Sequence, residues 1–562
     1  MRRPLRRRTA VLLATLLLAA CTADTPAAPD APLDVPAAPD PGTAVPDTPA
    51  AVVRVGLARD PATLDPRRLA DDEGALVVQA LFDGLVDVGP DGGIVDAAAA
   101  DWTVEDDGRT YRFLLREDRF HDGTPVRAAD HAAALLATLD PQRAPLFRQD
   151  LLTTIRGARL VDDDGTVRWG LPADVLAAGG VEVVGPRELV LRLTRPDPLL
   201  LYRLADPALS PLPPLATDDP QAFALRPVGN GPFRMAGPRE PGAFIRLAAW
   251  EAHPRPARID ELVLQVYEDD VDGSARWDDL LAERLRITGV PAQRREEARR
   301  RFGTPLDGRR GPGLHTLPSA ALYAYGMAVD VPPYDDVRLR RAISAAIDRD
   351  AVAELVATAG AVPATGIVPP HLGGDVPDCD HCRHDPDLAR ALIDDWRADR
   401  PGDAAEPPLT LTYPRGAGHV GIAERVADDL EATLGLDVRL QARDFATLVR
   451  AVETREAPLF RLGLRAVHGG AAAGVTMLDP ALRPGAAENW TGWSEVEVGT
   501  LLDGWDPARP DATVRAVERR ALDAAALVPI LWTPADLVVH PAIGGFHLDP
   551  TGRWWPELVY LR

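Results

Sequence analysis

The sequence contains no lysine, little cysteine and no recognisable catalytic motif. All 62 basic residues are arginines, and the 84 acidic residues give a formal net charge of −22. This negative charge argues against nucleic acid as a partner, because such binding depends on neutralising phosphates. There is no Gly-x-Ser-x-Gly elbow, His-Glu-x-x-His pair, P-loop or dinucleotide-binding glycine run. The sequence therefore predicts a protein that is not an enzyme and has no cofactor.

Long apolar runs are also scarce, and the clearest one lies near the N-terminus. Five arginines within the first eight residues precede an apolar run from Val11 to Ala20. This run is shorter than the about 20 apolar residues that span a bilayer, and its layout is that of an export signal. It ends in Leu18-Ala19-Ala20-Cys21, which resembles the signal of bacterial lipoproteins. That resemblance implies that residues 1–20 are removed and that Cys21 carries acyl chains.

Acyl chains on Cys21 would hold the protein at a membrane, since each buried CH₂ contributes about 0.8 kcal/mol. The alternative is a short N-terminal anchor helix in which Cys21 is incidental. Residues 21–50 are dominated by Ala, Pro, Asp and Thr. Such a segment buries too little apolar surface to become ordered, and its prolines make it a semi-extended tether. We expect an exported protein anchored on the outer face of the cell membrane or in a periplasm.

The globular part begins with alternating patterns of strands and helices. Residues 52–57 alternate apolar and other side chains with period two, which predicts a half-buried strand. A helix is expected over 73–82, a second strand over 111–115 and a second helix over 128–139.

The C-terminal half contains a β-α-β pattern. A strand face at Leu409, Leu411 and Tyr413 is followed by a helix over 422–430 that Gly435 can cap, and alternation returns over 436–440. The crossover rule makes the two strands parallel. Asp385-Pro386 is expected to open another helix, as N-cap and first helical residue. The fold class is therefore α/β.

Ordered motifs along the chain resemble a known family of binding proteins. The most specific are Leu64-Asp65-Pro66, Leu81-Phe82-Asp83-Gly84-Leu85-Val86, Tyr111-Arg112-Phe113-Leu114-Leu115-Arg116 and Phe120-His121-Asp122-Gly123-Thr124-Pro125. Later motifs are Val228-Gly229-Asn230-Gly231-Pro232-Phe233, Pro332-Pro333-Tyr334-Asp335-Asp336-Val337 and Val528-Pro529-Ile530-Leu531-Trp532. The chain after the tether resembles extracellular solute-binding protein family 5, the oligopeptide, dipeptide and nickel receptors of ABC importers.

The resemblance implies a periplasmic-binding-protein-like clamshell (type II, cluster C-like) with two α/β lobes and an inserted domain. Domain I would comprise residues 51–83, 226–312 and 535–562, domain II residues 84–225, and domain III residues 313–534. A monomer would hold a peptide or peptide-like solute between domains I and III and close around it. The closed form would then be recognised by an ABC permease and its ATPase.

The expected ligand site departs from the family pattern. Peptide receptors of the family commonly use a Gly-Trp-x-x-Asp stretch, whose carboxylate binds the peptide amine. The corresponding stretch here, 462–470, lacks both the Trp and the Asp and offers Arg465 and His468 instead. An arginine there would suit a carboxylate or phosphate, although Arg465 could equally face solvent. This departure argues against a peptide whose free amine is held by a carboxylate of the protein.

Aromatic residues complete the candidate set. Tyr323 and Tyr325 alternate on an expected strand that faces the ligand, and Trp490, Trp493 and Trp532 lie in segments that line the pocket in related proteins. Aromatic side chains give broad apolar contact with a polar tip, which suits varied ligands. Each of them could instead belong to the core.

Cys379 and Cys382 are interleaved with His381 and His384. Four such ligands within six residues are compatible with a metal site, but one cluster on a short loop rarely completes a tetrahedron. Outside the cytosol a disulfide is the favoured interpretation, with no bound metal. Two functional alternatives to the importer receptor stay open: a surface or sensory lipoprotein that has lost transport, and a receptor for a metal or metallophore.

Overall fold

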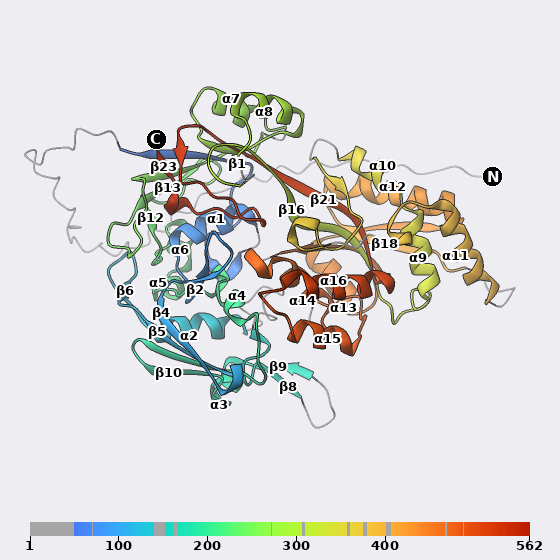
Figure 1. Cartoon of the computed structure of the whole chain (residues 1–562), viewed down its shortest axis with the longest axis horizontal. Helices are drawn as coiled ribbons and strands as arrows, with labels where there is room; N and C mark the ends of the chain where they lie inside the picture. Colours follow the sequence, from blue (N-terminus) through green and yellow to red (C-terminus); the bar gives the residue numbers. More distant parts are fainter. Residues whose placement is uncertain are drawn as a thin grey trace, which may run out of the picture. The chain divides into compact units, whose positions relative to one another are not determined.

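One large mixed sheet runs through the structure and carries both lobes (Figure 1). The structure is a computed structural model that describes residues 50–69, 71–139, 152–161, 167–270, 272–305, 309–356, 360–374, 379–400, 406–466, 469–486 and 488–562. Residues 50–562 form one unit. The expected signal, Cys21 and nearly all of the tether lie outside the described residues, as does His468.

The order of strands in this sheet is β12-β13-β14-β1-β15-β21-β16-β20-β18-β19, and β17 pairs with β21 at its side. Their bounds are β1 Val52–Leu57, β12 Phe233–Met235, β13 Phe244–Ala249, β14 Glu261–Val266, β15 Ile287–Gly289, β16 Gly313–Met327, β17 Val362–Pro363, β18 Leu409–Pro414, β19 Val438–Arg443, β20 Leu459–Arg465 and β21 Leu527–Val539. Strands far apart in sequence are thus neighbours in one sheet.

The local patterns of the sequence are confirmed. The expected early elements appear as β1, α1 (Asp72–Leu81), β5 (Thr110–Leu115) and α2 (Ala128–Ala137). Asp71 begins α1 because its carboxylate accepts a hydrogen bond of 2.6 Å from the Gly74 amide.

The expected β-α-β unit consists of β18, α12 (Ala417–Leu434) and β19, and its two strands are parallel. Gly435 follows α12 with a φ of 65°, a left-handed conformation that glycine adopts without strain. Leu436 was expected within the second strand but lies before it, since β19 begins at Val438. Asp385 caps α11 (Pro386–Ala398), as predicted.

The long strands β16 and β21 connect the two lobes. Their first pairs run from Gly313↔Val539 to Pro318↔Pro534. Pairing resumes at Leu322↔Trp532 after an irregularity, and a second shift of register follows between Tyr323 and Ala324. Leu314 and Val538 pack with Trp277 on α7 (Ser274–Leu281), on the domain I side. We propose the three expected domains for this architecture, with the junction of domains I and III between Pro318 and Leu322, not at residue 313.

The domain III part of the sheet has a core on each face. One core includes Tyr323, Tyr325 and Tyr413 and the helices α9 (Val337–Ala346), α10 (Arg349–Leu355), α11 and α12. The other includes Leu322, Phe460 and Leu462 and the helices α13 (Phe445–Glu453), α14 (Ala473–Leu482) and α16 (Pro510–Asp523).

Domain II has its own sheet, of order β10-β11-β5-β4, with β4 at Ala99–Glu105, β10 at Val181–Gly185 and β11 at Glu188–Arg192. Its buried face includes Phe113 and Leu191, which belong to the same core as Met477 on α14 of domain III. Domains II and III therefore share one hydrophobic core.

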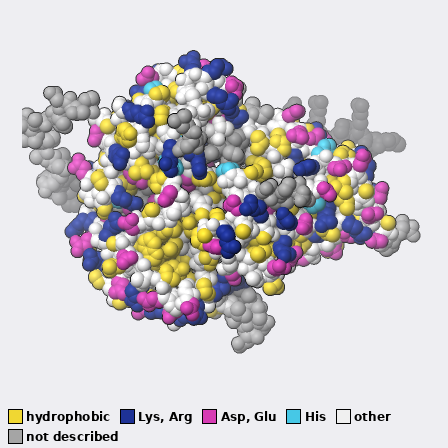
Figure 2. All heavy atoms as spheres, viewed as in Figure 1, with side chains coloured by type: hydrophobic (Ala, Val, Ile, Leu, Met, Phe, Trp, Pro, Cys, Tyr) yellow, Lys and Arg dark blue, Asp and Glu magenta, His cyan; other side chains and the backbone are white. Residues whose placement is uncertain are grey.

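The remaining elements are short and lie around these sheets. They are β2 Val86–Val88, β3 Ile94–Asp96, β6 Asp118–Arg119, β7 Pro125–Val126, β8 Arg159–Val161, β9 Val167–Trp169, α3 Pro172–Ala177, α4 Leu200–Leu204, α5 Leu215–Asp218, α6 Pro220–Leu225, α7 Ser274–Leu281, α8 Arg295–Phe302, α15 Val496–Asp503, β22 Ile543–Gly544 and β23 Tyr560–Leu561. Among the described residues, no helix is both long and apolar enough to cross a bilayer. Acidic and arginine side chains are interspersed over the face seen in Figure 2.

A buried ion network joins domain II to domain III. Arg203 on α4 pairs with Asp197 and donates a hydrogen bond of 2.6 Å to Asp479 on α14. Arg483 donates to the other oxygen of Asp479 at 2.7 Å. Burial alone would raise the pKa of Asp479, but the charges of Arg203 and Arg483 outweigh it and hold that pKa below its usual value. Each buried charge thus has an opposite charge beside it.

We expect Arg203→Ala to lower the free energy of unfolding by about 3–5 kcal/mol, because it leaves two buried carboxylates with less compensation. Urea denaturation at neutral pH measures this loss. The control is Arg439→Ala, whose partner Asp437 is largely exposed; it should change the free energy by no more than about 1 kcal/mol. A loss for Arg203→Ala as small as that of the control would contradict the prediction.

Candidate ligand-binding site

Two adjacent strands of domain III bring the candidate polar residues together. Strands β16 and β20 are antiparallel, with Tyr325 opposite Arg461, Tyr323 opposite Gly463 and Ala321 opposite Arg465. Because side chains alternate along a strand, both tyrosines and both arginines are on one face of the sheet.

The Arg461 side chain lies over its neighbours on that face. Its guanidinium carbon is 4.6 Å from the centroid of the Tyr323 ring, a cation–π contact. A Cβ atom at position 463 would come within 2.8 Å of the Arg461 Nη1 atom. Glycine at this position therefore leaves the space that the guanidinium occupies.

Arg461 has no anionic partner among the described residues. Arg443, Arg455 and Arg465 each pair with a carboxylate. No described carboxylate lies within ion-pair distance of Arg461, and its buried Nε has no hydrogen-bond acceptor. Burial lowers the pKa of its guanidinium, and only nearby tyrosines oppose that effect. Arginine nevertheless stays protonated in proteins. The site thus contains a half-buried positive charge that nothing in the described chain neutralises.

The start of α12 adds further groups to the same place. The Nδ1 atom of His419 is 3.4 Å from the Tyr323 hydroxyl oxygen, and the two rings are 5.7 Å apart. Burial lowers the pKa of His419, as does the charge of Arg461, so this imidazole is neutral at physiological pH. No side chain caps α12 at Gly416, so the first N–H groups of an 18-residue helix add partial positive charge here.

This arrangement suits a carboxylate. Arg461 offers a planar pair of donors, Tyr323 a hydroxyl and His419 a ring nitrogen, all on one side of the sheet. These donors could hold and orient a carboxylate.

The ligand-binding residues predicted from the sequence do not all lie together in the structure. Tyr323 is part of the arrangement around Arg461, and Tyr325 lies fully buried beside it, with the two rings 5.9 Å apart. Arg465 is exposed and pairs with Asp72, the first residue of α1. Its charge is therefore already compensated in this structure.

The three tryptophans lie on the opposite face of the sheet. Trp493 and Trp532 are buried in the core that domains II and III share, and Trp490 packs against that core. The structure does not bring them together with Tyr323 and Tyr325. The reason is the register: Leu322, not Tyr323, is opposite Trp532.

Sequence reasoning missed Arg461 and His419. A signal was present, because Arg461 lies two residues before Gly463 and so shares a strand face with Arg465. The placement of His419 was harder to anticipate, since it depends on how α12 packs against β16.

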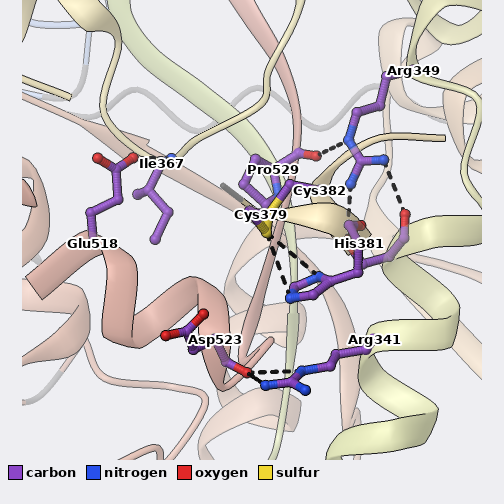
Figure 3. The surroundings of a disulfide bond; sticks show 10 residues. Arg341, Arg349, Ile367, Cys379, His381, Cys382, Glu518, Asp523 and Pro529 are labelled. Carbon is purple, nitrogen blue, oxygen red and sulfur yellow. Dashed lines mark hydrogen bonds between the residues drawn. A yellow bond between two sulfur atoms is a disulfide. The ribbon is translucent and has the colours of Figure 1, made fainter. Parts of the chain in front are cut away.

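Cys379 and Cys382 form a disulfide, as shown in Figure 3. Cys379 directly precedes the short helix Asp380–Cys382, and Cys382 is its last residue. His381 contacts Cys379, whereas His384 lies apart, 3.9 Å from Asp348. Of the four residues grouped in the sequence, Cys379, His381 and Cys382 therefore lie together, and His384 lies apart.

The unpaired charge of Arg461 leads to a prediction about stability. In protein freed of solute by unfolding and refolding, Arg461→Met should leave the free energy of unfolding unchanged or raise it by about 1 kcal/mol, because an uncompensated charge is removed. Urea denaturation tests this.

Arg349→Met is the control, since Arg349 is more deeply buried than Arg461 but donates to the carbonyls of Pro529, Ser344 and Ile347. Its loss should cost at least about 2 kcal/mol by leaving buried acceptors unsatisfied. An equal cost for both variants would show that Arg461 has a structural partner.

Comparisons with known proteins identify the family. Residues 93–484 match the model described as "Bacterial extracellular solute-binding proteins, family 5 Middle". The chain is 26% identical to the "Probable deoxycholate-binding periplasmic protein YgiS" of Escherichia coli (strain K12), over 92% of this chain and 94% of that one. It is 22% identical to the oligopeptide-binding protein OppA of Bacillus subtilis (strain 168), over 91% and 92%.

Solved structures have the same fold. The binding protein AgaA in complex with agropinic acid, from A. tumefaciens R10, aligns with a TM-score of 0.69 and 23% identity, over 91% of this chain and 99% of that chain. The two-lobe α/β clamshell expected from the sequence is thereby confirmed. The chain belongs to family 5 of the bacterial extracellular solute-binding proteins, the non-enzymatic receptors of ABC importers.

Proposed function

We propose that this chain is an exported, lipid-anchored receptor that captures a carboxylate-bearing solute at Arg461 and delivers it to an ABC permease. The observation that carries the proposal is the half-buried Arg461 guanidinium without a carboxylate partner among the described residues. A buried charge is costly unless it is paired. A carboxylate of the solute would supply the missing partner.

The chemistry of the relatives' ligands supports this solute class. Deoxycholate and agropinic acid, named for two of the relatives, are both carboxylic acids, and a peptide ends in a carboxylate. What these ligands share is the acid group and not the peptide backbone. Capture of a carboxylate therefore fits both a peptide and a smaller organic acid.

The N-terminal amine of a peptide has no equivalent acidic partner in the corresponding stretch of this chain. The stretch where peptide receptors of the family place an acidic residue has Val467 and His468, which lie outside the described residues. Arg465 in the same stretch is positively charged and pairs with Asp72. A fixed counter-charge for an ammonium group is therefore missing from the stretch, and we propose that a free amine contributes little to affinity.

Closure around the solute would involve the lobe-connecting strands. The pair Arg465–Asp72 links β20 to the start of α1, so it joins domain III to domain I. The irregular pairing between Pro318 and Leu322 lies where β16 passes from one domain to the other. We propose that closing turns the domains at this irregularity and that Arg465–Asp72 forms only in the closed form.

Binding of matched acids and amides tests the solute class. Refolded protein is titrated with peptides and organic acids, each beside its carboxamide, and the melting temperature is recorded. The acid of a binding pair should bind at least about tenfold more tightly than its amide, because a charge-assisted hydrogen bond is worth about 1.5–3 kcal/mol. Arg461→Met should remove this preference.

Arg465→Met is the matched control, since it changes the other arginine on the same strand face. It should retain the preference for acids. Equal affinity for acids and amides in the wild type would contradict a carboxylate site. Loss of the preference in Arg465→Met but not in Arg461→Met would show that Arg465, and not Arg461, binds the carboxylate.

The proposed anchor makes a separate prediction. In a bacterium with lipoprotein processing, the wild type should fractionate with membranes and incorporate a labelled fatty acid, because Cys21 is acylated. Cys21→Ser should lose the label and appear in the soluble exported fraction. Cys379→Ser serves as the control cysteine and should keep the label. A labelled Cys21→Ser protein would disprove the anchor.

A further inference from the structure

A third potential metal ligand lies against the disulfide in domain III. The Sγ atom of Cys379 is 3.6 Å from Nε2 and 3.8 Å from Nδ1 of His381. One potential ligand atom from each of Cys379, His381 and Cys382 lies within 4.8 Å of the other two. All three side chains are buried, with exposed fractions of 7%, 8% and 1%. Buried sulfur and imidazole groups this close are the ligand set that zinc uses in proteins.

The imidazole has no other partner among the described residues. Both of its ring nitrogens contact Sγ of Cys379, and Figure 3 shows the ring turned toward the sulfur atoms. A buried imidazole usually finds a polar partner, so one that meets only sulfur has unused capacity to bind.

The positions of these residues do not depend on the disulfide alone. The His381 carbonyl accepts a hydrogen bond of 2.7 Å from the Ser344 hydroxyl on α9, and the Cys382 amide donates to the Cys379 carbonyl at 3.2 Å. Asp385, which caps α11, donates its own amide to the Ala345 carbonyl at 2.9 Å. The loop is therefore attached to α9 at His381, between the cysteines, and at Asp385, which follows them and begins α11.

Charged groups of both signs surround the loop, since Arg341, Arg349, Asp523 and Asp380 all act electrostatically on His381. Arg349 donates to the carbonyls of Pro529, Ser344 and Ile347, and Arg341 donates to the Asp523 carbonyl. Neither guanidinium pairs with a carboxylate among the described residues, and both act electrostatically on His381. Two thiolates and one Zn²⁺ form a neutral site beside these cations, so binding adds no net charge.

We propose that Cys379, His381 and Cys382 bind Zn²⁺, or a similar thiophilic d¹⁰ cation, when the disulfide is reduced. Reduction takes two electrons and two protons from a dithiol, which itself becomes a disulfide. Zn²⁺ then displaces the two thiol protons, and water takes the fourth position of the tetrahedron. The disulfide and the metal site are thus alternative states of one loop. This site is distinct from Arg461 and independent of the proposed transport function.

Zinc binding by the reduced full-length mature protein tests the proposal. The disulfide is reduced with a phosphine under nitrogen, and Zn²⁺ is titrated in competition with a chromophoric chelator. We expect one zinc ion per chain, measured by elemental analysis, and none on the oxidised protein. Co²⁺ in place of Zn²⁺ should give the near-ultraviolet thiolate-to-metal band of a sulfur-ligated ion.

Single variants assign the ligands. Cys379→Ser should abolish tight binding and the Co²⁺ band, and His381→Asn should weaken zinc binding at least tenfold. His384→Asn is the matched control, because His384 lies on the same loop but next to Asp348, and it should bind zinc like the wild type.

Three results would overturn the proposal. One is a reduced wild type that binds no more zinc than Cys379→Ser, and another is a His381→Asn variant with unchanged affinity. Circular dichroism supplies the third: if reduction unfolds the protein and zinc does not restore its spectrum, the ligands are held only by the disulfide. A reduced protein that keeps its spectrum and binds zinc through these residues supports the proposal.

Discussion

The pairing of β16 with β21 is the interaction on which the architecture depends. These two strands hold the domain I strands on one side and the domain III strands on the other within a single sheet. Their backbone hydrogen bonds continue on both sides of the irregularity between Pro318 and Leu322. This irregular stretch is where we propose that the two lobes turn on closure, because the pairing on either side of it can stay intact.

Two arginines show how differently the structure treats buried charge. Arg203 lies between Asp197 and Asp479, so its burial strengthens the contact of two domains. Arg461 lies over Tyr323 with no described carboxylate, although the chain has many more acidic than basic residues. In so acidic a protein, an arginine without a described carboxylate partner is the observation on which the proposed anion site rests.

Much of the fold could be predicted from sequence because its signals are local. The cap at Asp385, the alternation in β1 and the β18-α12-β19 unit all follow from neighbouring residues. The site was less predictable, because it depends on which strands become neighbours. That Arg461 lies opposite Tyr325, and that Trp532 faces away from Tyr323, follow from the registers of β20 and β21 on β16. A one-residue difference in register reverses the face of every side chain.

The core that domains II and III share has a consequence for how such receptors diversify. Phe113 and Leu191 of domain II pack in one cluster with Met477 and Trp532 of domain III. Exchanging domain III alone between two receptors would join surfaces that did not evolve together and would leave part of this core mismatched. A transferable specificity module in this fold therefore has to include the inserted domain, even though that domain contributes no residue to the arrangement around Arg461.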